Sequence, residues 1–432
     1  MKQKLGGLLL KIRQNRKLAI ILIGVAGVVV IGIVYGLLLA RPPSSANVQT
    51  QKGTATQPTQ AANKKQAFRQ SRGPANAGPC SDGPLFNHLP MALADFRSFR
   101  PLGFVTQPTH IFGAKHSSFT INLPHESKKG LKVVFPSDAL VTAIISTESK
   151  RSAGYQMTFY PCSDFKSYFF HLGTISERLQ REIKGGKATC QNVGTGENLI
   201  KKCQVDIEVK VESGELAGTN DGFAGVDFGA VDYRLPPAQY ANLKRYDGDY
   251  PHYTSPILYF TPTLKSQLES KLRSIDGAVL RTAEPKVGTL LQDIKGTAQG
   301  NWFIGDKSFN NSQDFSPFLA LLHDYIDPLQ PLFSMGTSVK GLNMGLYGFK
   351  PRGSGVINRD FKDIKPDGST YCFDSFLTGK TVGGLNLSAV SGAIIMAMPD
   401  ESKLKVEKIG QAGSSCVNTT LAFSSAATIF DR

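Results

Sequence analysis

The chain has 432 residues, of which 41% are apolar and 19% charged, so its composition is that of a globular protein and excludes disorder throughout. Its formal charge of +15 suggests nucleic acid, yet residues 1–80 hold 12 basic residues and no acidic one. The rest of the chain has 37 basic against 34 acidic residues, an excess of only three. A nucleic-acid-binding domain carries its positive charge on the folded part, so we expect no nucleic-acid partner.

Residues 18–40 contain no charged or amide side chain. As a helix they would span about 35 Å, enough to cross a hydrocarbon core of roughly 30 Å. Six basic residues precede them, which predicts a cytoplasmic tail at 1–17 and residues 41–432 outside. A cleaved signal peptide is the alternative, but its apolar region usually has about 7–15 residues. The segment therefore predicts a retained signal anchor in the cell membrane, with Gly32 and Gly36 at a spacing that can pair helices.

Residues 41–79 are rich in Ala, Gln, Ser, Thr and Pro and have one aromatic residue, Phe68. Such a segment buries too little apolar surface to offset the entropy of ordering, which predicts a disordered linker.

All six cysteines follow the apolar segment, which suits disulfides in an oxidising compartment. Sequence proximity favours Cys190 with Cys203 and Cys372 with Cys416, which leaves Cys80 for Cys162. Six cysteines allow 15 pairings, so the sequence alone does not choose among them, and free thiols remain the alternative.

Short runs of β-branched and aromatic residues, separated by Gly, Pro, Asn and Ser, predict a mainly β fold. Examples are 131–135, 140–145, 155–160, 205–211 and 393–398. We expect two helices, one at 174–183 and one after Thr263, where Leu264, Leu268 and Leu272 lie four apart. A Pro-rich stretch at 235–262 predicts a boundary near residue 250 between two β-rich domains, 80–250 and 251–432.

Four segments resemble the lysostaphin-like zinc endopeptidases in the same order along the chain. KVVFPSDALVTAI (132–144) is similar to the family's VxAPxDGxVxxV, and His116 with Thr120 falls at its His-x-x-x-Asp. YFFHL (168–172) resembles its Y-x-HL strand. GELAG (214–218) resembles the hairpin before the last catalytic strand, which would be 226–234. The resemblance implies a small β-barrel or sandwich, covering about a quarter of the chain.

The same resemblance implies that the peptidase site is lost. In the family, zinc is held by the His and Asp of His-x-x-x-Asp and by the second His of His-x-His, and two further histidines assist hydrolysis. Here His116 is the first ligand, Thr120 replaces the Asp, and Gly229 replaces the third ligand. Asp227 replaces one helper histidine, and only the helper at His171 remains. A catalytic zinc usually needs three protein ligands, so we expect no metal and no cofactor.

An alternative is a rebuilt metal site in which His116, His171 and Asp227 converge, as two imidazoles and a carboxylate can bind metal. The other interpretation is that they are leftover polar residues that hydrogen-bond to one another.

Other motifs are weaker. His323 and Asp327 would share a face only if their segment is helical, and Trp302 is more typical of a core or turn aromatic than of a sugar platform. Asn310, Asn386 and Asn418 lie in glycosylation sequons. The Asp367-Gly368 pair predicts a turn between strands at 361–364 and 370–373. Residues 251–432 contain no recognisable catalytic set.

These features predict a membrane-anchored extracytoplasmic protein whose inactive peptidase-like domain binds a cell-envelope polymer or a partner protein. The alternative is a metal-dependent cell-wall hydrolase with a rebuilt site.

Overall fold

A computed structural model describes residues 73–106, 110–121, 130–150, 153–193, 199–221, 225–309 and 317–432. By its internal contacts the chain divides into residues 1–67 and 68–432, and all described residues belong to the second unit. The expected cytoplasmic tail, membrane helix and most of the linker therefore lie outside the described residues. Within the described ranges, no helix is long and apolar enough to span a bilayer.

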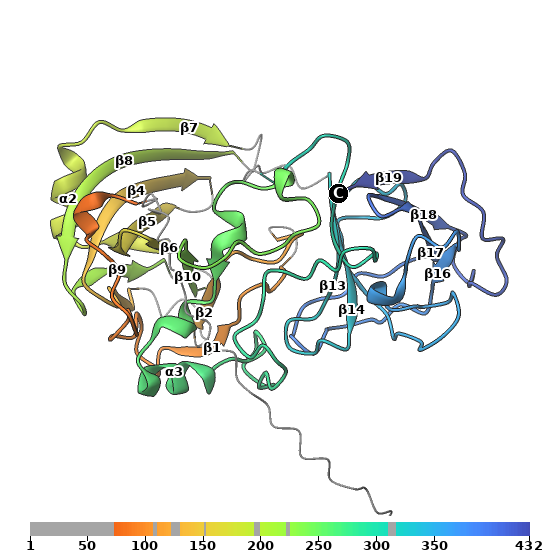
Figure 1. The fold of residues 1–432 in the computed structure, drawn as a ribbon, viewed down its shortest axis with the longest axis horizontal. Coiled ribbons are helices and arrows are strands. Elements are labelled where there is room, and N and C mark those ends of the chain that lie inside the picture. Colours follow the sequence, from red (N-terminus) through yellow and green to blue (C-terminus); the bar gives the residue numbers. More distant parts are fainter. Residues whose placement is uncertain are drawn as a thin grey trace, which may run out of the picture. The chain divides into compact units, whose positions relative to one another are not determined.

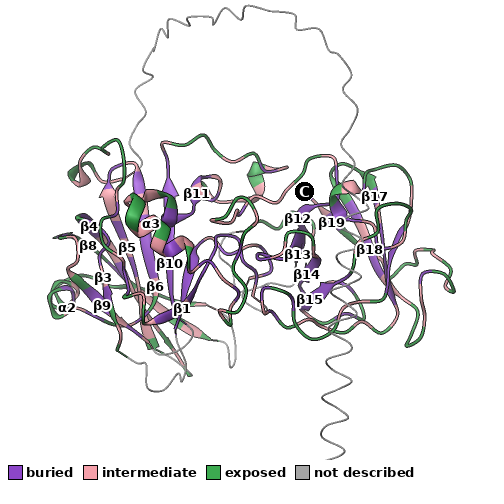
Figure 2. Ribbon diagram, turned by 90° about the horizontal axis from the view of Figure 1, so that it is seen from below, coloured by how far each residue is buried: buried purple, intermediate pink, exposed green. Residues whose placement is uncertain are grey.

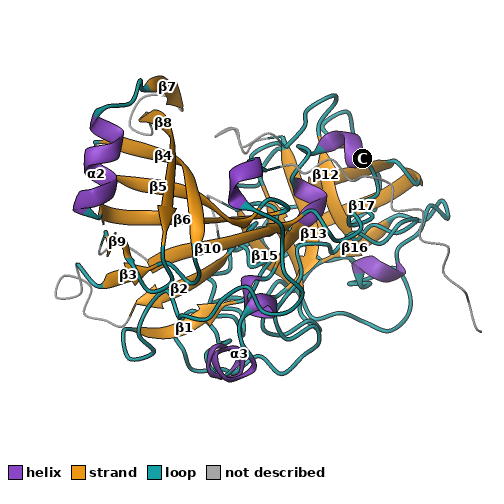
Figure 3. Cartoon of the chain, turned by 60° about the vertical axis from the view of Figure 1, so that its left-hand side comes forward, coloured by secondary structure: helices purple, strands orange, loops and turns teal. Residues whose placement is uncertain are grey.

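The mainly β fold is confirmed, and the strands form two antiparallel sheets (Figure 1). The first sheet has 11 strands and the order β1-β2-β10-β6-β5-β4-β8-β7, with β11 paired to β10 and β9 paired to both β3 and β6. It curls into a half-barrel (Figure 3). Its strands are β1 (Phe96–Arg100), β2 (Ser117–Ile121), β3 (Lys132–Val134), β4 (Ala139–Ser149), β5 (Ala153–Cys162), β6 (Phe165–Ile175), β7 (Thr189–Val193), β8 (Ile200–Val211), β9 (Leu216–Asn220), β10 (Gly225–Asp232) and β11 (Tyr253–Thr254).

The second sheet has eight strands in the order β15-β14-β13-β12-β19-β18-β17-β16. They are β12 (Gly300–Phe303), β13 (Phe318–His323), β14 (Pro331–Met335), β15 (Gly345–Gly348), β16 (Tyr371–Phe373), β17 (Ala393–Asp400), β18 (Lys403–Ile409) and β19 (Thr428–Asp431). The first sheet thus ends at Thr254 and the second starts at Gly300. The domain boundary near residue 250 stays a prediction.

Two short α-helices lie at the positions expected, with shifted ends. Helix α2 (Glu177–Lys184) begins only after β6, because Ser176 accepts a hydrogen bond from the Leu179 amide and caps it. Helix α3 (Pro262–Glu269) starts with proline at its first position and ends before Leu272, which instead bridges to Phe99 of β1. The leucine spacing therefore overestimated the length of the second helix.

Two further expectations in the second half are wrong. Residues Phe361–Asp363 form a 3-10 turn rather than a strand, because Asp360 caps the Lys362 amide. The partner of β16 is consequently β17. His323 ends strand β13, so it does not share a helical face with Asp327.

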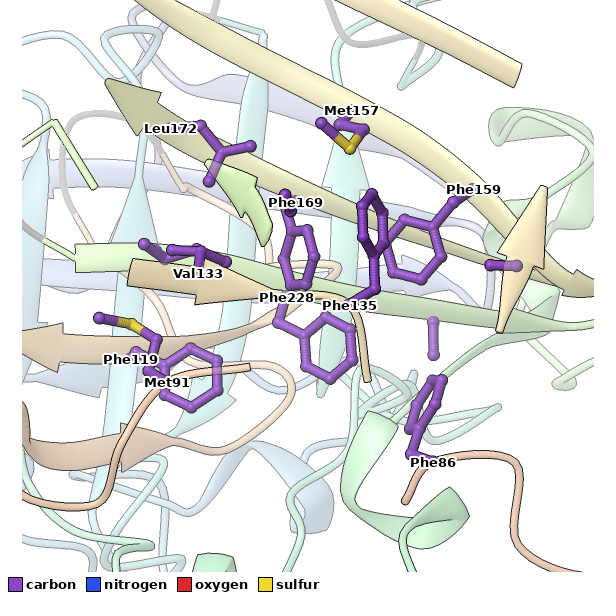
Figure 4. Close-up of a cluster of buried hydrophobic side chains, with 14 of the residues drawn as sticks. Phe86, Met91, Phe119, Val133, Phe135, Met157, Phe159, Phe169, Leu172 and Phe228 are labelled. Carbon is purple, nitrogen blue, oxygen red and sulfur yellow. The ribbon is translucent and has the colours of Figure 1, made fainter. Parts of the chain in front are cut away.

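Phenylalanines dominate the core of the first sheet. Phe135, Phe159, Phe169 and Phe228 are fully buried, and Figure 4 shows their rings gathered together. Phe159, Phe169 and Phe228 come from β5, β6 and β10, and Phe135 directly follows β3. The ring centroids of Phe159 and Phe169 are 5.2 Å apart, as are those of Phe169 and Phe228. Such aromatic pairs add stability beyond the area they bury. Burial is concentrated in the strands, whereas α3 presents an exposed side (Figure 2).

A separate apolar cluster joins residues of the two sheets. Phe112, which precedes β2, packs its ring 5.1 Å from that of Phe303 on β12 and 4.9 Å from that of Phe318 on β13. Phe104 and Ile111 belong to the same buried cluster. Phe104, Ile111 and Phe112, which lie between β1 and β2, are therefore held in one apolar cluster with residues of the second sheet.

All six cysteines are paired as sequence proximity favours. The bonds join Cys80 to Cys162, Cys190 to Cys203 and Cys372 to Cys416. This is the chemistry of an oxidising compartment such as the extracellular space.

Candidate functional site

Three neighbouring strands of the first sheet bring three predicted site residues together. Asp227 on β10 lies opposite Ser118 of β2 on one side and opposite Phe170 of β6 on the other. His116 immediately precedes β2, and His171 follows Phe170. Because neighbouring strands are about 4.8 Å apart, this register places both imidazoles beside one carboxylate.

One carboxylate oxygen of Asp227 faces both rings. Its Oδ2 atom lies 3.4 Å from Nε2 of His116 and 3.2 Å from Nε2 of His171. His116 is 4% exposed and Asp227 is 6% exposed, whereas the side chain of His171 is 52% exposed. We call these residues the His116–Asp227–His171 cluster; only His171 opens it to solvent.

The pKa values of the three groups are shifted in different directions. Burial alone would raise the pKa of Asp227, but His116 and His171 outweigh it and lower that pKa well below its usual range. Burial lowers the pKa of His116, and attraction to Asp227 offsets this only in part. Burial also acts to lower the pKa of His171, yet attraction and hydrogen bonding to Asp227 raise it above the ordinary value. At neutral pH the cluster is thus a carboxylate with a neutral buried imidazole and a readily protonated surface imidazole.

His171 has a left-handed backbone with φ of 64° in the middle of strand β6. The pairing of β6 with β5 shifts register across it, between Phe169 and Leu172, and the pairing with β9 shifts just after it, between Leu172 and Thr174. Non-glycine residues in this region cost about 1–3 kcal/mol and concentrate at functional sites. The irregularity turns the imidazole towards Asp227 and towards Asp221, whose Oδ2 lies 3.9 Å from Nδ1.

Arg100 and His110 adjoin the cluster, and sequence reasoning missed both. Arg100 ends β1, donates to the Ser118 hydroxyl at 2.9 Å and lies 3.9 Å over the Phe104 ring. His110 packs its ring 5.2 Å from that of His116, and burial, reinforced by His116, lowers its pKa to about 3. No motif marks either residue. Arg100 gives no alternation signal either, because Ser98, Phe99 and Arg100 are all buried in β1.

Thr120 and Gly229, the other two predicted positions, do not join the cluster. Thr120 is buried on β2, and its hydroxyl finds no hydrogen-bond partner within the described ranges. At Gly229 the ring of Tyr168 occupies the space that a side chain would fill, well inside van der Waals contact of an added Cβ. The Tyr168 hydroxyl donates to the Lys115 carbonyl at 2.9 Å. The absence of a side chain at Gly229 therefore leaves no pocket there.

Within the described ranges, no group of three or more His, Cys, Asp or Glu residues is placed to hold a metal ion. Elsewhere, His323 contacts Asp360 through Nε2 at 3.1 Å in a buried pair, not Asp327. Trp302 is fully buried and donates to the Ala298 carbonyl, which confirms a core aromatic.

Beside the cluster, one face of the first sheet carries polar and aromatic side chains. Along β5, Met157 and Phe159 point into the core, so the alternate residues lie on the opposite face. We define this outer face by its half-buried residues Thr142, Gln156, Thr158, Tyr160 and Phe170. At one end it holds a shallow, open depression lined by Gly73, Pro74, Thr142, Tyr160, Asp206, Ile207 and Glu208.

Neither a known family model nor a curated protein matches this chain. The resemblance to the lysostaphin-like endopeptidases therefore stays a prediction from the motifs.

Proposed function

We propose that this is a membrane-anchored extracytoplasmic protein that uses the outer face of its first sheet to bind a cell-envelope polymer or a partner protein. The alternation of Gln156, Thr158 and Tyr160 offers amide, hydroxyl and aromatic groups on one side of the sheet. Such mixed surfaces suit extended peptides or glycans, because a few polar groups fix orientation while aromatic rings supply contact area.

The observation that carries the proposal is the limited access to the His116–Asp227–His171 cluster, in which only His171 is exposed. The carboxylate is buried and already in contact with both imidazoles, and Tyr168 fills the space at Gly229. A hydrolytic site needs an open position for substrate or water next to its catalytic groups. Binding through the outer face needs no such opening.

The first test is co-sedimentation of the full-length chain with insoluble wall polymer from its own cell. Changing Gln156→Ala together with Thr158→Ala removes two side chains of the outer face, and we expect at least a fivefold loss of bound protein. Gln411→Ala with Thr282→Ala is the matched control, since both residues are exposed and lie elsewhere in the sequence. Equal binding by both double variants would contradict the outer face as the binding site.

A hydrolase with a rebuilt metal site is the second candidate, because Oδ2 of Asp227 lies 3.4 Å from Nε2 of His116 and 3.2 Å from Nε2 of His171. Against it, these residues as placed form no ion-holding group in the described part of the chain. Elemental analysis of the purified full-length chain separates the two proposals. We expect less than about a tenth of an equivalent of transition metal. Near one equivalent, lost on His116→Ala or Asp227→Ala, would favour the hydrolase and call for a peptidase assay.

A further inference from the structure

The main path of the first sheet ends at β1 and β7, and the second sheet ends at β15 and β16. Three of these four end strands are covered by other parts of the chain. Next to β1, the amide of Phe99 donates to the Lys271 carbonyl at 2.7 Å. Next to β15, Ser388 donates to Leu346 at 2.7 Å, and next to β16, Cys372 donates to Val356 at 2.9 Å. Strand β7 ends the first sheet, and within the described ranges its backbone bonds only to β8. Of these four end strands, β7 is thus the one whose outer backbone groups have no partner among the described residues.

The register shows which backbone groups this edge offers. Cys190 lies directly opposite Cys203, and their Cα atoms are 4.0 Å apart. Directly opposed antiparallel residues are about 4.5 Å apart when they do not bond to each other and about 5.5 Å when they do. Cys190 is therefore in a non-hydrogen-bonded pair, and so is Asn192 two residues on. The amide and carbonyl groups of Cys190 and Asn192 point away from β8.

Strand β7 has none of the features that usually prevent pairing at an exposed strand edge. Proteins usually protect bare edges with charged residues, proline or bulges. The sequence Thr-Cys-Gln-Asn-Val has no charge and no proline, its pairing with β8 runs through five residues without a shift, and four of the five residues are exposed. The disulfide between Cys190 and Cys203 fixes the strand against β8, so the edge is held straight.

We propose that a second copy of this chain pairs with this edge, β7 against β7 in antiparallel orientation about a twofold axis at Gln191. In this register Cys190 of each copy faces Asn192 of the other, and the four outward amide and carbonyl groups of each strand are satisfied. Gln191 faces its own equivalent, where two side-chain amides can hydrogen-bond.

The lack of charge favours a second copy over another partner. In a twofold contact every charge near the axis meets its own like charge, which is destabilising, and β7 has none. Lys201 and Lys202, which lie opposite β7 on β8, are one strand farther from the axis. They would be about three strand spacings, roughly 14 Å, from their equivalents, which exceeds the screening length of about 8 Å at physiological salt. A charged peptide, by contrast, would find no opposite charge on β7 itself. Five paired residues bury less than the roughly 1,200 Å² typical of stable complexes, so we expect a weak, concentration-dependent dimer.

The test is sedimentation velocity of the full-length chain in a mild detergent over a range of concentrations. We expect Gln191→Lys and Gln191→Glu each to weaken the dimer roughly tenfold or more, because each places like charges face to face. An equimolar mixture of the two variants should restore it, since Lys then faces Glu. Gln411→Lys is the matched control on another exposed glutamine and should leave the dimer unchanged.

A second variant tests the backbone contact itself. Asn192→Pro removes an outward amide while leaving the bonds between β7 and β8, because proline is tolerated on an edge strand whose amide faces solvent. We expect this variant to be monomeric and folded by circular dichroism. A monomeric native chain, or a dimer that persists in Gln191→Lys and Gln191→Glu, would overturn the proposal. The latter result would place self-association elsewhere, for example in the predicted membrane helix.

Discussion

At the scale of single residues, Asp227 organises the electrostatics of the candidate site. Its carboxylate outweighs the effect of burial on His171 and raises the pKa of that imidazole. The raised pKa stabilises the fold at pH below the ordinary histidine pKa of about 6.5, and this contribution disappears as the pH rises through the raised value. The lowered pKa of Asp227 acts in the other direction, stabilising the fold above the ordinary aspartate pKa and losing that effect in acid.

Asp227→Asn should therefore lower the pKa of His171, because a neutral amide no longer favours the imidazolium. NMR titration of the His171 ring protons measures this directly. Asp221→Asn is the matched control, since its carboxylate lies at 3.9 Å rather than 3.2 Å and should produce a smaller fall. Equal shifts in the two variants would mean that Asp227 is not the dominant partner.

At Gly229, the absence of a side chain leaves room for the ring of Tyr168. An added Cβ would collide with the Tyr168 ring, and overpacking of a close-packed interior typically costs about 1–3 kcal/mol. We expect Gly229→Ala to reduce the free energy of unfolding by at least that amount in urea denaturation. Gly353→Ala, where an added Cβ meets nothing within 4 Å, should change it little. A tolerated Gly229→Ala would show that Tyr168 is free to move aside.

The residue scale is also where sequence reasoning reached its limit. The sequence left open whether His116, His171 and Asp227 converge, and the structure brings the three side chains into contact. Sequence reasoning did not identify Arg100 or His110, which come from a different strand and a connecting segment. A sequence also does not show which neighbouring ring fills the space beside Gly229, which is the ring of Tyr168.

At the scale of elements, the disulfides differ in how much chain they constrain. Cys80 and Cys162 are separated by 82 positions, whereas Cys190 and Cys203 are separated by 13. Loop-entropy arguments give about 4.5 kcal/mol for the longer loop and about 3 kcal/mol for the shorter one. The longer bond also anchors the segment at Gly73, whose amide donates to the Ser163 carbonyl.

Replacing Cys80 and Cys162 by Ala should thus reduce the free energy of unfolding by about 1–2 kcal/mol more than replacing Cys190 and Cys203. Guanidinium denaturation of both double variants under non-reducing conditions measures the difference. A larger loss for the Cys190 and Cys203 pair would show that strain or residual structure, rather than loop length, controls the outcome.

Strand positions were predictable because alternating β-branched and aromatic residues report burial directly. The ends of the helices and strands were less predictable. Leu264, Leu268 and Leu272 share a helical spacing, but Leu272 pairs with β1 because a tertiary contact outweighs the local pattern. At His323 an apolar run was compatible with helix or strand, and short runs do not separate the two.

At the scale of the whole molecule, the sequence predicted two β-rich regions but not how the described residues of both sheets share a buried cluster. That cluster depends on aromatic residues in irregular segments, such as Phe104, Phe112 and Phe309, which carry no periodic signal. The cluster also lies next to the candidate site. Phe104 contacts the rings of both His110 and His116, at 5.7 and 5.5 Å, so packing at this cluster supports the imidazoles.

Phe112→Ala tests whether this cluster makes the described residues unfold as one cooperative unit. Phe112 is 2% exposed and contacts Phe303, Phe309 and Phe318, so the variant should lose about 3–5 kcal/mol. If the cluster couples the two sheets, differential scanning calorimetry will show one transition in the native chain and two in the variant, because loss of the shared aromatic packing lets the sheets melt separately.

Phe361→Ala is the matched control, since Phe361 is equally buried but packs only within the core of the second sheet. It should lower the melting temperature without splitting the transition. Two transitions already present in the native chain would show that the two sheets are energetically independent despite their contact.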